Sequence, residues 1–264
     1  MGFFGELAKG VFNAMKESTD KYKKSYDSSS DISMDAGSRG GDNSLVKAIK
    51  ASNRIVKSWC LISELSAEIK AGNRIFKFGN YFINDNKTKE PIEWRVLEVS
   101  NNKALLITKD AIDCKPYNNE FERITWEYCS LRHWLNNEFI NQAFSKEEQN
   151  EIVLTNISNP NNAFHRTNGG NNTQDKIFLL SIDETQKYFK DDKDRECKAT
   201  NYAKKQGEWT SDYKKYLGNC SWWLRSPGHD QNYATGVYSD GDFLVGINVS
   251  YNNIAVRPAL YINL

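Results

Sequence analysis

The spacing of hydrophobic positions divides the chain at about residue 74, with a helical pattern before it and a strand-like pattern after it. Between residues 45 and 71 no proline interrupts, and apolar side chains recur every seven residues, at Ala48, Ile55, Ile62 and Ile69. Gly72 and Asn73 follow as a stop signal, so the pattern predicts one long helix over residues 45–73. Its partial heptad seam supports two interpretations equally: a homo-oligomer assembled through residues 45–71, or a helix packed on the domain that follows.

Residues 1–44 carry two further segments. Apolar residues recur at helical spacing near the start of the chain, at Phe3, Phe4, Leu7, Val11, Phe12 and Met15, which predicts a short amphipathic helix over residues 1–19. Such a helix either docks on its own protein or contacts a membrane surface or a partner. Residues 20–44 are rich in Ser, Asp and Gly and nearly free of aliphatic side chains, so we expect a flexible linker there.

After residue 74 the pattern of residue types changes to one typical of strands and turns. Three segments are rich in β-branched and aromatic residues: RIFKFGNYFI (74–83), IEWRVLEVS (92–100) and KALLITKDAI (103–112). Asn101 and Asn102 separate the last two segments and suit a tight turn. The three segments therefore predict an antiparallel meander.

Helix start signals recur three times after the meander. The first is Ser130, which precedes an apolar helix face made of Leu131, Trp134, Leu135 and Phe139. The other two are capping boxes, in which a serine is followed three residues later by a glutamate: Ser145 with Glu148, and Ser181 with Glu184. We expect these two or three helices to cover the sheet, and the charged residues 190–215 to be irregular.

The chain ends in two further strand patterns. Hydrophobic side chains alternate after a turn at residues 239–241, at Phe243, Val245, Ile247 and Val249. A second alternation predicts a last strand over residues 254–264 that closes the sheet beside the first strands, and it involves Ile254, Val256, Leu260 and Ile262. Together the patterns predict one α+β domain over residues 74–264 with antiparallel sheets, preceded by an N-terminal helical extension.

Composition limits the classes of partner. The chain has 35 basic and 34 acidic side chains, a net charge of +1, so no overall positive field would attract nucleic acid. No run of about eighteen consecutive apolar residues occurs, so we expect no integral membrane segment. The first residues lack the basic start, apolar run and cleavage site of a secretory signal, and we therefore expect a soluble, cytoplasmic protein.

Residue types that carry chemistry are sparse. The five cysteines are widely spaced and include no CxxC pair, which argues against a zinc site and a disulfide framework and fits a reducing compartment. His133, His165 and His229 have no second ligand at metal spacing, and no nucleophile or phosphate-binding motif is present. Asp240 and Asp242 favour a hairpin turn over a calcium site. We therefore expect no catalytic residue, no cofactor and no bound metal.

The most distinctive stretch is CSWWLRSPG, residues 220–228. Trp222 and Trp223 would supply core area. Arg225 in this stretch and Arg257 in IAVRPAL both lie among apolar residues, where a guanidinium group needs carboxylate or carbonyl acceptors. We expect both arginines to tie the interior together through forks of hydrogen bonds; the alternative is an anion-binding pair.

Several long motifs occur in a specific order: PIEWRVLEV, TWEYCSLRHWLNNEF, TQDKIFLLSIDE, WWLRSPG and VRPALYINL. In this order they strongly resemble a widespread bacterial family that is catalogued as a domain of unknown function, over residues 74–264. That family is similar to the C-type-lectin-like domains of formylglycine-generating enzymes and of the variable proteins of diversity-generating retroelements. The resemblance implies a compact lectin-like fold in which the segment between WWLRSPG and VRPAL lies on an exposed binding face.

Two departures from these relatives bear on function. The formylglycine-generating oxidases use a cysteine pair near this region, whereas here Cys220 lies there alone and Cys197 is distant in sequence. The calcium-binding EPN and WND motifs of sugar-binding lectins are absent. The sequence therefore gives little support to oxidase activity and none to calcium-dependent carbohydrate recognition.

The leading hypothesis is a non-enzymatic module that binds a protein or another macromolecular ligand. Polar and aromatic side chains are concentrated after Gly228 in the manner of an antibody paratope, and we assign ligand binding to His229, Asp230, Asn232, Tyr233, Tyr238, Asp240, Asp242, Asn248, Ser250, Tyr251, Asn252 and Asn253. The asparagine and tyrosine content of this segment also fits a retroelement-diversified variable protein. The alternatives are a structural or regulatory domain without a ligand site, an oxidase or hydrolase, and a function that resides in residues 1–73.

Overall fold

The computed structural model describes residues 67–68 and 74–264. Residues 67 and 68 are helical, as the long-helix prediction requires at that point. The predicted helix over residues 1–19, the predicted linker over residues 20–44 and the remainder of the predicted helix over residues 45–73 lie outside the described residues. The α+β domain predicted over residues 74–264 falls within them.

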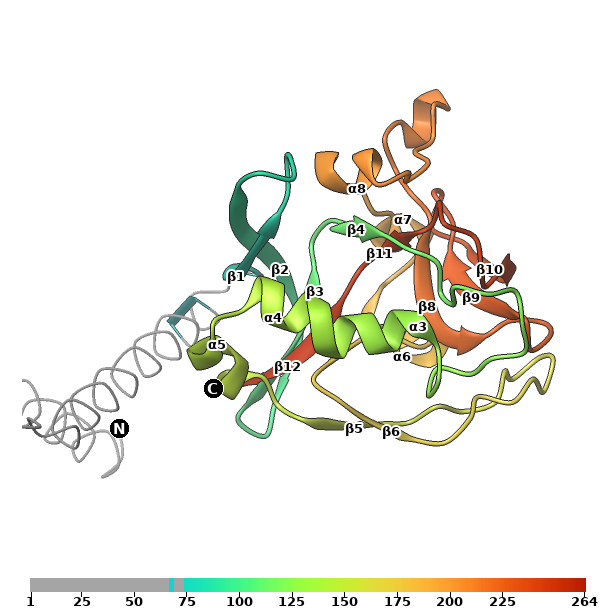
Figure 1. The fold of residues 1–264 in the computed structure, drawn as a ribbon, viewed down its shortest axis with the longest axis horizontal. Helices are drawn as coiled ribbons and strands as arrows, with labels where there is room; N and C mark the ends of the chain where they lie inside the picture. The colour runs from blue at the N-terminus through green and yellow to red at the C-terminus, as the bar shows by residue number, and fades with distance from the viewer. Residues whose placement is uncertain (1–66, 69–73) are drawn as a thin grey trace, which may run out of the picture. The chain divides into compact units, whose positions relative to one another are not determined.

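The first sheet joins the beginning and the end of the described domain. Its five strands lie in the order β1 (Ile75–Phe82), β2 (Lys89–Ser100), β3 (Lys103–Thr108), β12 (Ala259–Asn263) and β7 (Ile177–Phe178) (Figure 1). All four neighbouring pairs are antiparallel. The predicted meander is therefore confirmed, and so is the prediction that the last strand closes the sheet beside the first ones.

The turn between β2 and β3 follows directly from its two asparagines. Asn101 and Asn102 have φ values of 50° and 57°, in the left-handed region that asparagine tolerates better than most residues. Two successive left-handed residues form the type I′ turn that matches the twist of a two-residue hairpin. The local sequence thus sets the register of this part of the sheet.

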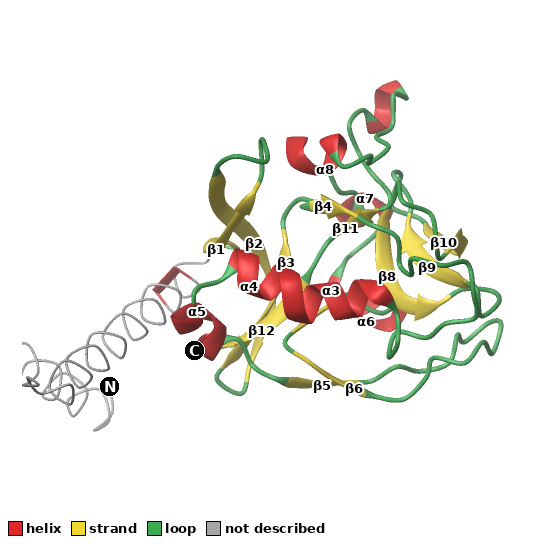
Figure 2. Ribbon diagram, in the orientation of Figure 1, coloured by secondary structure: helices red, strands yellow, loops and turns green. Residues whose placement is uncertain are grey.

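The second sheet carries the segment predicted to bind ligand. Its strands lie in the order β10 (Phe243–Asn248), β9 (Tyr233–Val237), β8 (Trp222–Pro227), β11 (Ala255–Val256) and β4 (Asp113–Cys114). The pairing of β11 with β8 is parallel, whereas the other three pairings are antiparallel. Figure 2 shows this sheet and the first one at opposite ends of a central helical run.

The prediction of one strand over residues 254–264 was wrong. The segment divides into β11, in the second sheet, and β12, in the first. Arg257 and Pro258 lie between them, and proline has no N–H group with which to continue a ladder. The chain therefore changes sheets at this point and links the two halves of the core.

The central helical run comprises α3 (Ser130–Trp134), the π-helical turn η1 (Leu135–Phe139) and α4 (Ile140–Ala143). It confirms the predicted helix, but the capping residue differs from the prediction. The Cys129 side chain accepts the hydrogen bond from the Arg132 amide, and the Ser130 hydroxyl oxygen instead accepts from the amide of Asn119. The serine thus anchors the preceding loop rather than the helix.

Two short helices, α5 (Lys146–Glu151) and α6 (Ile182–Tyr188), begin where the sequence predicts. Both capping boxes are complete, with reciprocal bonds between side chain and backbone in Ser145 with Glu148 and in Ser181 with Glu184. A two-stranded sheet, β5 (Thr155–Ile157) and β6 (Thr173–Asp175), lies between these helices in the sequence.

The prediction that residues 190–215 are irregular was wrong in part. Three single-turn helices interrupt this segment: α7 (Asp192–Arg195), α8 (Asn201–Lys205) and η2 (Lys214–Tyr216). The side chains of Asp191 and Thr200 accept hydrogen bonds from backbone amides and so cap α7 and α8. Asp191 and Thr200 are residue types that commonly cap helices, but the many charged side chains of this segment favoured the prediction of an irregular stretch.

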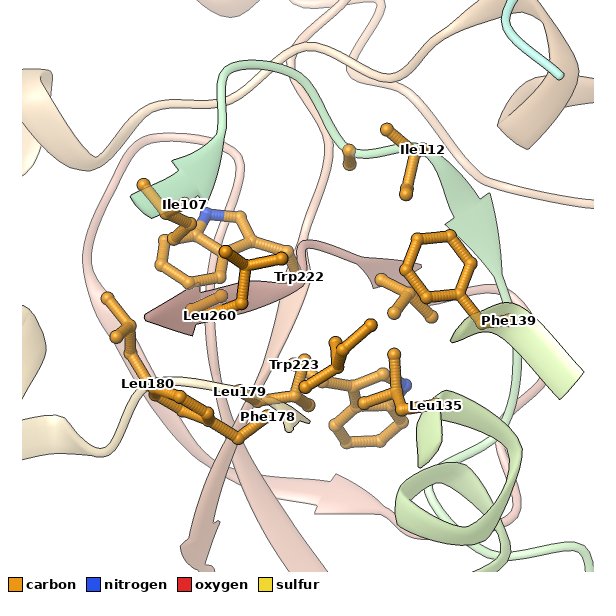
Figure 3. Close-up of a cluster of buried hydrophobic side chains, with 14 of the residues drawn as sticks. Ile107, Ile112, Leu135, Phe139, Phe178, Leu179, Leu180, Trp222, Trp223 and Leu260 are labelled. Atoms are coloured by element: carbon orange, nitrogen blue, oxygen red, sulfur yellow. The ribbon is translucent and has the colours of Figure 1, made fainter. Parts of the chain in front are cut away.

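The core lies between the sheets and the helical run. Leu135 and Phe139 on the helical run form one buried cluster with Trp222 and Trp223 of β8 (Figure 3). All four side chains are fully buried. Burying a large apolar side chain contributes about 1.5–3 kcal/mol, so the two adjacent tryptophans make β8 a principal source of cohesion. Every residue of this strand is buried.

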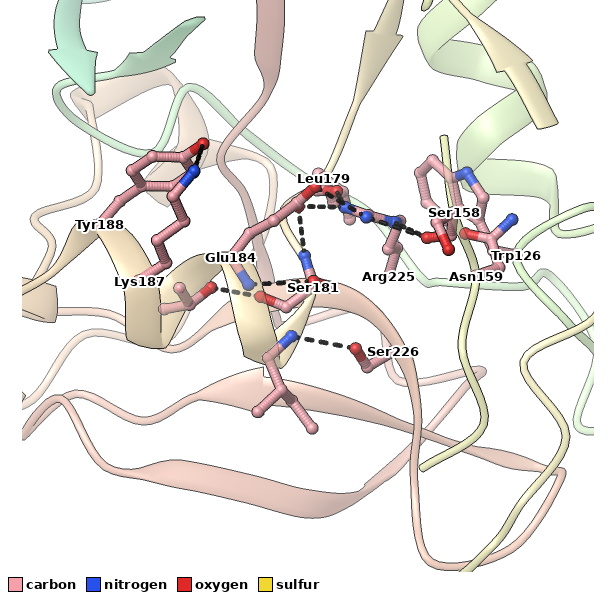
Figure 4. Close-up of polar contacts among 12 residues, drawn as sticks. Trp126, Ser158, Asn159, Leu179, Ser181, Glu184, Lys187, Tyr188, Arg225 and Ser226 are labelled. Atoms are coloured by element: carbon pink, nitrogen blue, oxygen red, sulfur yellow. Dashed lines mark hydrogen bonds and ion pairs between the residues drawn. The ribbon is translucent and has the colours of Figure 1, made fainter. Parts of the chain in front are cut away.

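Arg225 lies at the meeting point of several segments (Figure 4). Its guanidinium group forms a two-pronged ion pair with Glu184, with one N–H···O distance of 2.9 Å, and donates to the carbonyl oxygens of Leu179 at 2.7 Å and Ser158 at 3.0 Å. The Arg225 side chain is 3% exposed. One side chain thus joins β8, α6 and the loop after β5.

Arg257 has a comparable place at the other end of β8. It donates to the carbonyl oxygens of Thr108 at 2.9 Å and Lys109 at 3.1 Å, and its guanidinium group lies over the rings of Phe189 and Trp222. Because it follows β11, it holds the crossing between the two sheets against the end of β3. These contacts are made to carbonyls and rings within the protein.

We predict that Arg225→Lys lowers the free energy of unfolding by about 2–4 kcal/mol, because lysine cannot reproduce the fork and leaves buried acceptors without donors. A thermal melt should show a midpoint about 5–10 °C below that of the wild type. Arg123→Lys is the matched control, since the Arg123 side chain is 73% exposed and should tolerate the change. An Arg225→Lys protein of normal stability that had lost ligand binding would instead assign Arg225 to a binding site.

Candidate functional site

The residues assigned to ligand binding surround β9 and β10. His229, Asp230 and Asn232 lie in the loop before β9, and Tyr233 begins that strand. The segment 238–242 forms the turn between β9 and β10, and the segment 248–253 follows the end of β10 that pairs with Tyr233. The structure divides the assigned residues into three groups: those that line a hollow, those that form a row of rings, and those that build turns.

The first group lines a hollow of about 340 Å³ on the second sheet. Tyr238, Tyr251 and Asn253 contribute to it, together with two residues that the sequence analysis missed, Trp209 and Leu244. The four large side chains remain well exposed, at 46% for Trp209, 43% for Tyr238, 39% for Leu244 and 53% for Tyr251. The other lining residues are likewise uncharged: Ser221, Gly246, Ile247 and Ile254.

The floor of the hollow depends on Gly236 in β9. A Cβ atom at this position would lie 2.5 Å from the Cδ1 atom of Ile247 and 2.8 Å from the carbonyl oxygen of Trp222. The pairing of β10 with β9 is irregular between Leu244 and Ile247, which brings both of these side chains to the hollow. The missing side chain of Gly236 therefore provides the space in which Ile247 lies.

The second group forms a row of aromatic rings at the start of β9. The His229 ring stacks on Tyr233 with centroids 4.3 Å apart, and Phe121 and His165 extend the row at 5.9 Å from Tyr233 and 6.2 Å from His229. Asp230, at its margin, pairs with Arg123 at 3.3 Å. Phe121 and His165 were not assigned to the site, because they lie about 65 to 110 residues away in the sequence and reach the row through the fold.

The third group shapes turns with its polar atoms. The Asp240 carboxylate accepts from the amide of Asp242, and the Asn248 side-chain oxygen accepts from both the amide and the hydroxyl of Ser250. Asn252 presents its carbonyl oxygen to the Cys114 thiol at 3.1 Å, and the Asn232 carbonyl oxygen accepts from the amide of Val249 at 3.3 Å. These residues position the hollow and the row rather than line them. Among the residues that the structure describes, no cluster of three or more His, Cys, Asp or Glu side chains is arranged to hold a metal ion.

The buried side chain of Glu208 lies close to Cys114, Cys197 and Cys220, and the next residue, Trp209, lines the hollow. Glu208 is 7% exposed, and neither of its carboxylate oxygens has a hydrogen-bond partner within the described part of the chain. Burial raises its pKa from 4.5 to about 9, although the neighbouring Cys114 thiol acts in the opposite direction. Burial also raises the pKa of the Cys114 thiol.

The structure corrects the view that Cys197 is remote from Cys220. The Cys220 amide donates to the Cys197 carbonyl oxygen at 2.8 Å, and the Cys220 thiol approaches the same oxygen at 3.4 Å. The cause is an antiparallel bridge between Lys198 and Asn219, which brings the two ends of the intervening loop together. Separation in sequence concealed this contact.

The raised pKa of Glu208 predicts a pH-dependent difference between the wild type and Glu208→Gln. As pH rises from 4.5 towards 9, the unfolded chain releases the Glu208 proton while the folded chain keeps it, so this group increasingly favours unfolding. The stability of Glu208→Gln relative to the wild type should therefore increase between pH 5 and pH 9. Urea unfolding followed by tryptophan fluorescence measures the difference.

Glu138→Gln is the control for this comparison, because Glu138 is exposed on the helical run. Its stability should follow that of the wild type across the same range of pH. Parallel curves for the wild type and Glu208→Gln would contradict the assignment of a raised pKa to Glu208.

Comparisons with known proteins identify the domain family and nothing finer. Residues 101–264 match DUF6273, a domain of unknown function, and this match begins later than the resemblance over residues 74–264 had implied. No curated protein and no solved structure matches the chain. Within residues 67–68 and 74–264, no helix combines the length and apolar character needed to cross a membrane. Because the match covers more than half of its length, the chain belongs to the DUF6273 family of domains of unknown function.

Proposed function

We propose that the domain is a non-enzymatic binding module and that the hollow on the second sheet is its ligand site. The observation that carries this proposal is the grouping of Trp209, Tyr238, Leu244 and Tyr251, four large and well-exposed side chains around one concavity. Tryptophan and tyrosine dominate the energetic centres of protein interfaces. Exposed apolar side chains gathered in one place, rather than scattered, are typical of an interaction site.

The support beneath the hollow favours binding without reorganisation. β8 is buried along its whole length, and Gly236 lets Ile247 lie against the sheet. The tyrosines stand on turns whose polar side chains are already hydrogen-bonded to the backbone. A site held in this way loses little conformational entropy when a ligand binds.

The lining restricts the class of ligand. All of the residues around the hollow are uncharged, and Ser221 and Asn253 supply hydrogen-bonding groups among the apolar ones. The volume of about 340 Å³ lies at the small end of the range for ligand pockets, which run from about 300 to 1,000 Å³. The hollow therefore suits a single uncharged group of a larger ligand, such as an aromatic or aliphatic side chain of a protein.

The finer description of the scaffold is part of the same proposal. We assign it to the C-type-lectin-like class on the strength of the motifs in the sequence and of two supporting features. The strands at the beginning and end of the domain meet in one sheet, and the segment between WWLRSPG and VRPAL stands on the other sheet with Tyr238 and Tyr251 exposed.

The burial of the cysteine pair is the reason to favour binding over oxidase activity. Cys197 is 3% exposed and Cys220 is fully buried, so a peptide substrate cannot reach either sulfur atom in this conformation. The hollow, in contrast, is open to solvent. A structural or regulatory role without a ligand would give no reason for large exposed side chains to gather around one hollow.

The double variant Tyr238→Ala with Tyr251→Ala should lose ligand binding while keeping the thermal stability of the wild type, because both side chains are largely exposed. Peptide and glycan arrays probed with the full chain would identify ligands, and calorimetry would then measure the dissociation constant. Removing one aromatic anchor costs about 2 kcal/mol or more, which corresponds to a loss of about 30-fold or greater.

Tyr128→Ala provides the matched control, since Tyr128 is 70% exposed and does not line the hollow. Tyr233→Ala tests the row of rings separately. Undiminished binding by the double variant, with a loss in Tyr233→Ala, would move the site from the hollow to the row.

If the segment is diversified by a retroelement, its variation should follow the geometry of the site. Near-copies of the segment should differ at Tyr238 and Tyr251, which are exposed, and retain Gly236 and Asn248, which support the hollow. Sequencing beside a reverse-transcriptase gene of the source genome would test this. The absence of any near-copy would remove diversification and leave the binding proposal intact.

A further inference from the structure

The loop over residues 198–219 begins and ends at a pair of cysteines. Lys198 and Asn219 form an antiparallel bridge, so Cys197 and Cys220 are the next pair of residues across it. The loop between them carries Glu208 and Trp209, the latter a wall of the hollow. Figure 2 shows that most of the chain between α8 and β8 has no regular structure, and its course is held by a bridge of Thr210 with Cys220 and by backbone hydrogen bonds of Ser211.

The geometry at the base of this loop suits a disulfide bond. The Cys220 amide donates to the Cys197 carbonyl oxygen at 2.8 Å beside an isolated antiparallel bridge, so the two cysteines form one of the two bonds of a hydrogen-bonded cross-strand pair. The Cα atoms of such a pair are about 5.5 Å apart, and disulfides require about 4.4–6.8 Å. Side chains directly opposite one another project to the same face, and the Cys220 thiol already approaches the Cys197 backbone at 3.4 Å.

The surroundings distinguish the two thiols. Burial alone would raise the pKa of Cys197, but the hydrogen bond from Cys220 and the Arg257 guanidinium group outweigh it, and the pKa is lowered. The same hydrogen bond, followed by burial, raises the pKa of Cys220. Within the described residues, the Nη1 atom of Arg257 is buried without a hydrogen-bond partner, as are both Glu208 oxygens. In the folded protein the Cys197 thiol is therefore the more acidic of the two.

We propose that Cys197 and Cys220 form a disulfide bond by exchange with a small-molecule disulfide while the chain folds, before both sulfur atoms are buried, and that this bond closes the loop over residues 198–219. The Cys197 thiolate attacks the small disulfide, breaks its S–S bond and releases one thiolate. The Cys220 thiol then loses its proton and attacks the mixed disulfide at the Cys197 sulfur, releasing the second thiolate. Two protein thiols are oxidised, the small disulfide is reduced to two thiols, and the two protons pass to the leaving groups.

The disulfide has a consequence for the proposed ligand site. A covalent closure at the base of the loop restricts the positions available to Trp209, which stands within it. Oxidation would therefore restrict the movement of this wall of the hollow further than the backbone contacts of the reduced protein do. This consequence rests on the proposed function, but the disulfide itself does not.

The test uses the full chain with Cys60→Ser and Cys114→Ser, which removes two other thiols. The protein is unfolded in urea, refolded to equilibrium in glutathione buffers of stated ratio, and quenched with acid. Intact mass should fall by about 2 Da in the oxidising buffer, and non-reducing peptide mapping should join Cys197 to Cys220. Closing a loop of this length should raise the melting midpoint by about 5–10 °C over the reduced protein.

Cys197→Ser and Cys220→Ser, each in the same background, should show neither the mass loss nor the shift in the melting midpoint between buffers. Cys129→Ser is the matched control, because Cys129 is also buried yet bonds elsewhere, and it should retain both effects. The proposal is overturned if no crosslink forms, if the crosslink joins other cysteines, or if oxidation lowers the melting midpoint. None of these measurements uses a ligand, so failure of the binding proposal would leave them unaffected.

Discussion

The ion pair between Arg225 and Glu184 is the interaction on which the arrangement of the domain depends. The Glu184 carboxylate does two things at once, because it closes the capping box by accepting from the Ser181 amide at 2.9 Å and also receives the Arg225 fork. The start of α6 and the position of β8 are therefore fixed by one group. A charge buried in this way is tolerated because each of its donors has an acceptor, including the carbonyl oxygens of Ser158 and Leu179.

CSWWLRSPG mainly supports the proposed ligand site, to which it contributes only Ser221. Trp222 and Trp223 bury their rings on either side of β8, and Arg225 extends from the same strand to the polar network. The exposed surface begins after this strand, at His229. The residues that hold the core and most of those proposed to bind a ligand thus lie in consecutive stretches of chain, so the proposed surface could vary without loss of the core.

Local signals in the sequence predicted the elements whose causes are local. Asn101 with Asn102 and the two capping boxes each depend on residues within a few positions of one another. The errors arose where distant segments decide the outcome. Ser130 satisfies the amide of Asn119 rather than its own helix, and the strand predicted at the end of the chain breaks because two sheets compete for it. Trp209 and Cys197 were missed as neighbours of the site for the same reason.

The match to the family begins at residue 101, in the turn between β2 and β3, yet the folded unit begins earlier. Trp94 of β2 is fully buried, and its ring nitrogen donates to the carbonyl oxygen of Phe78 in β1. A polypeptide cut at residue 101 would leave β3 as a bare sheet edge, open to pairing with another chain, over an uncovered core. The stretch by which relatives are recognised is therefore shorter than the stretch that packs as one folded unit.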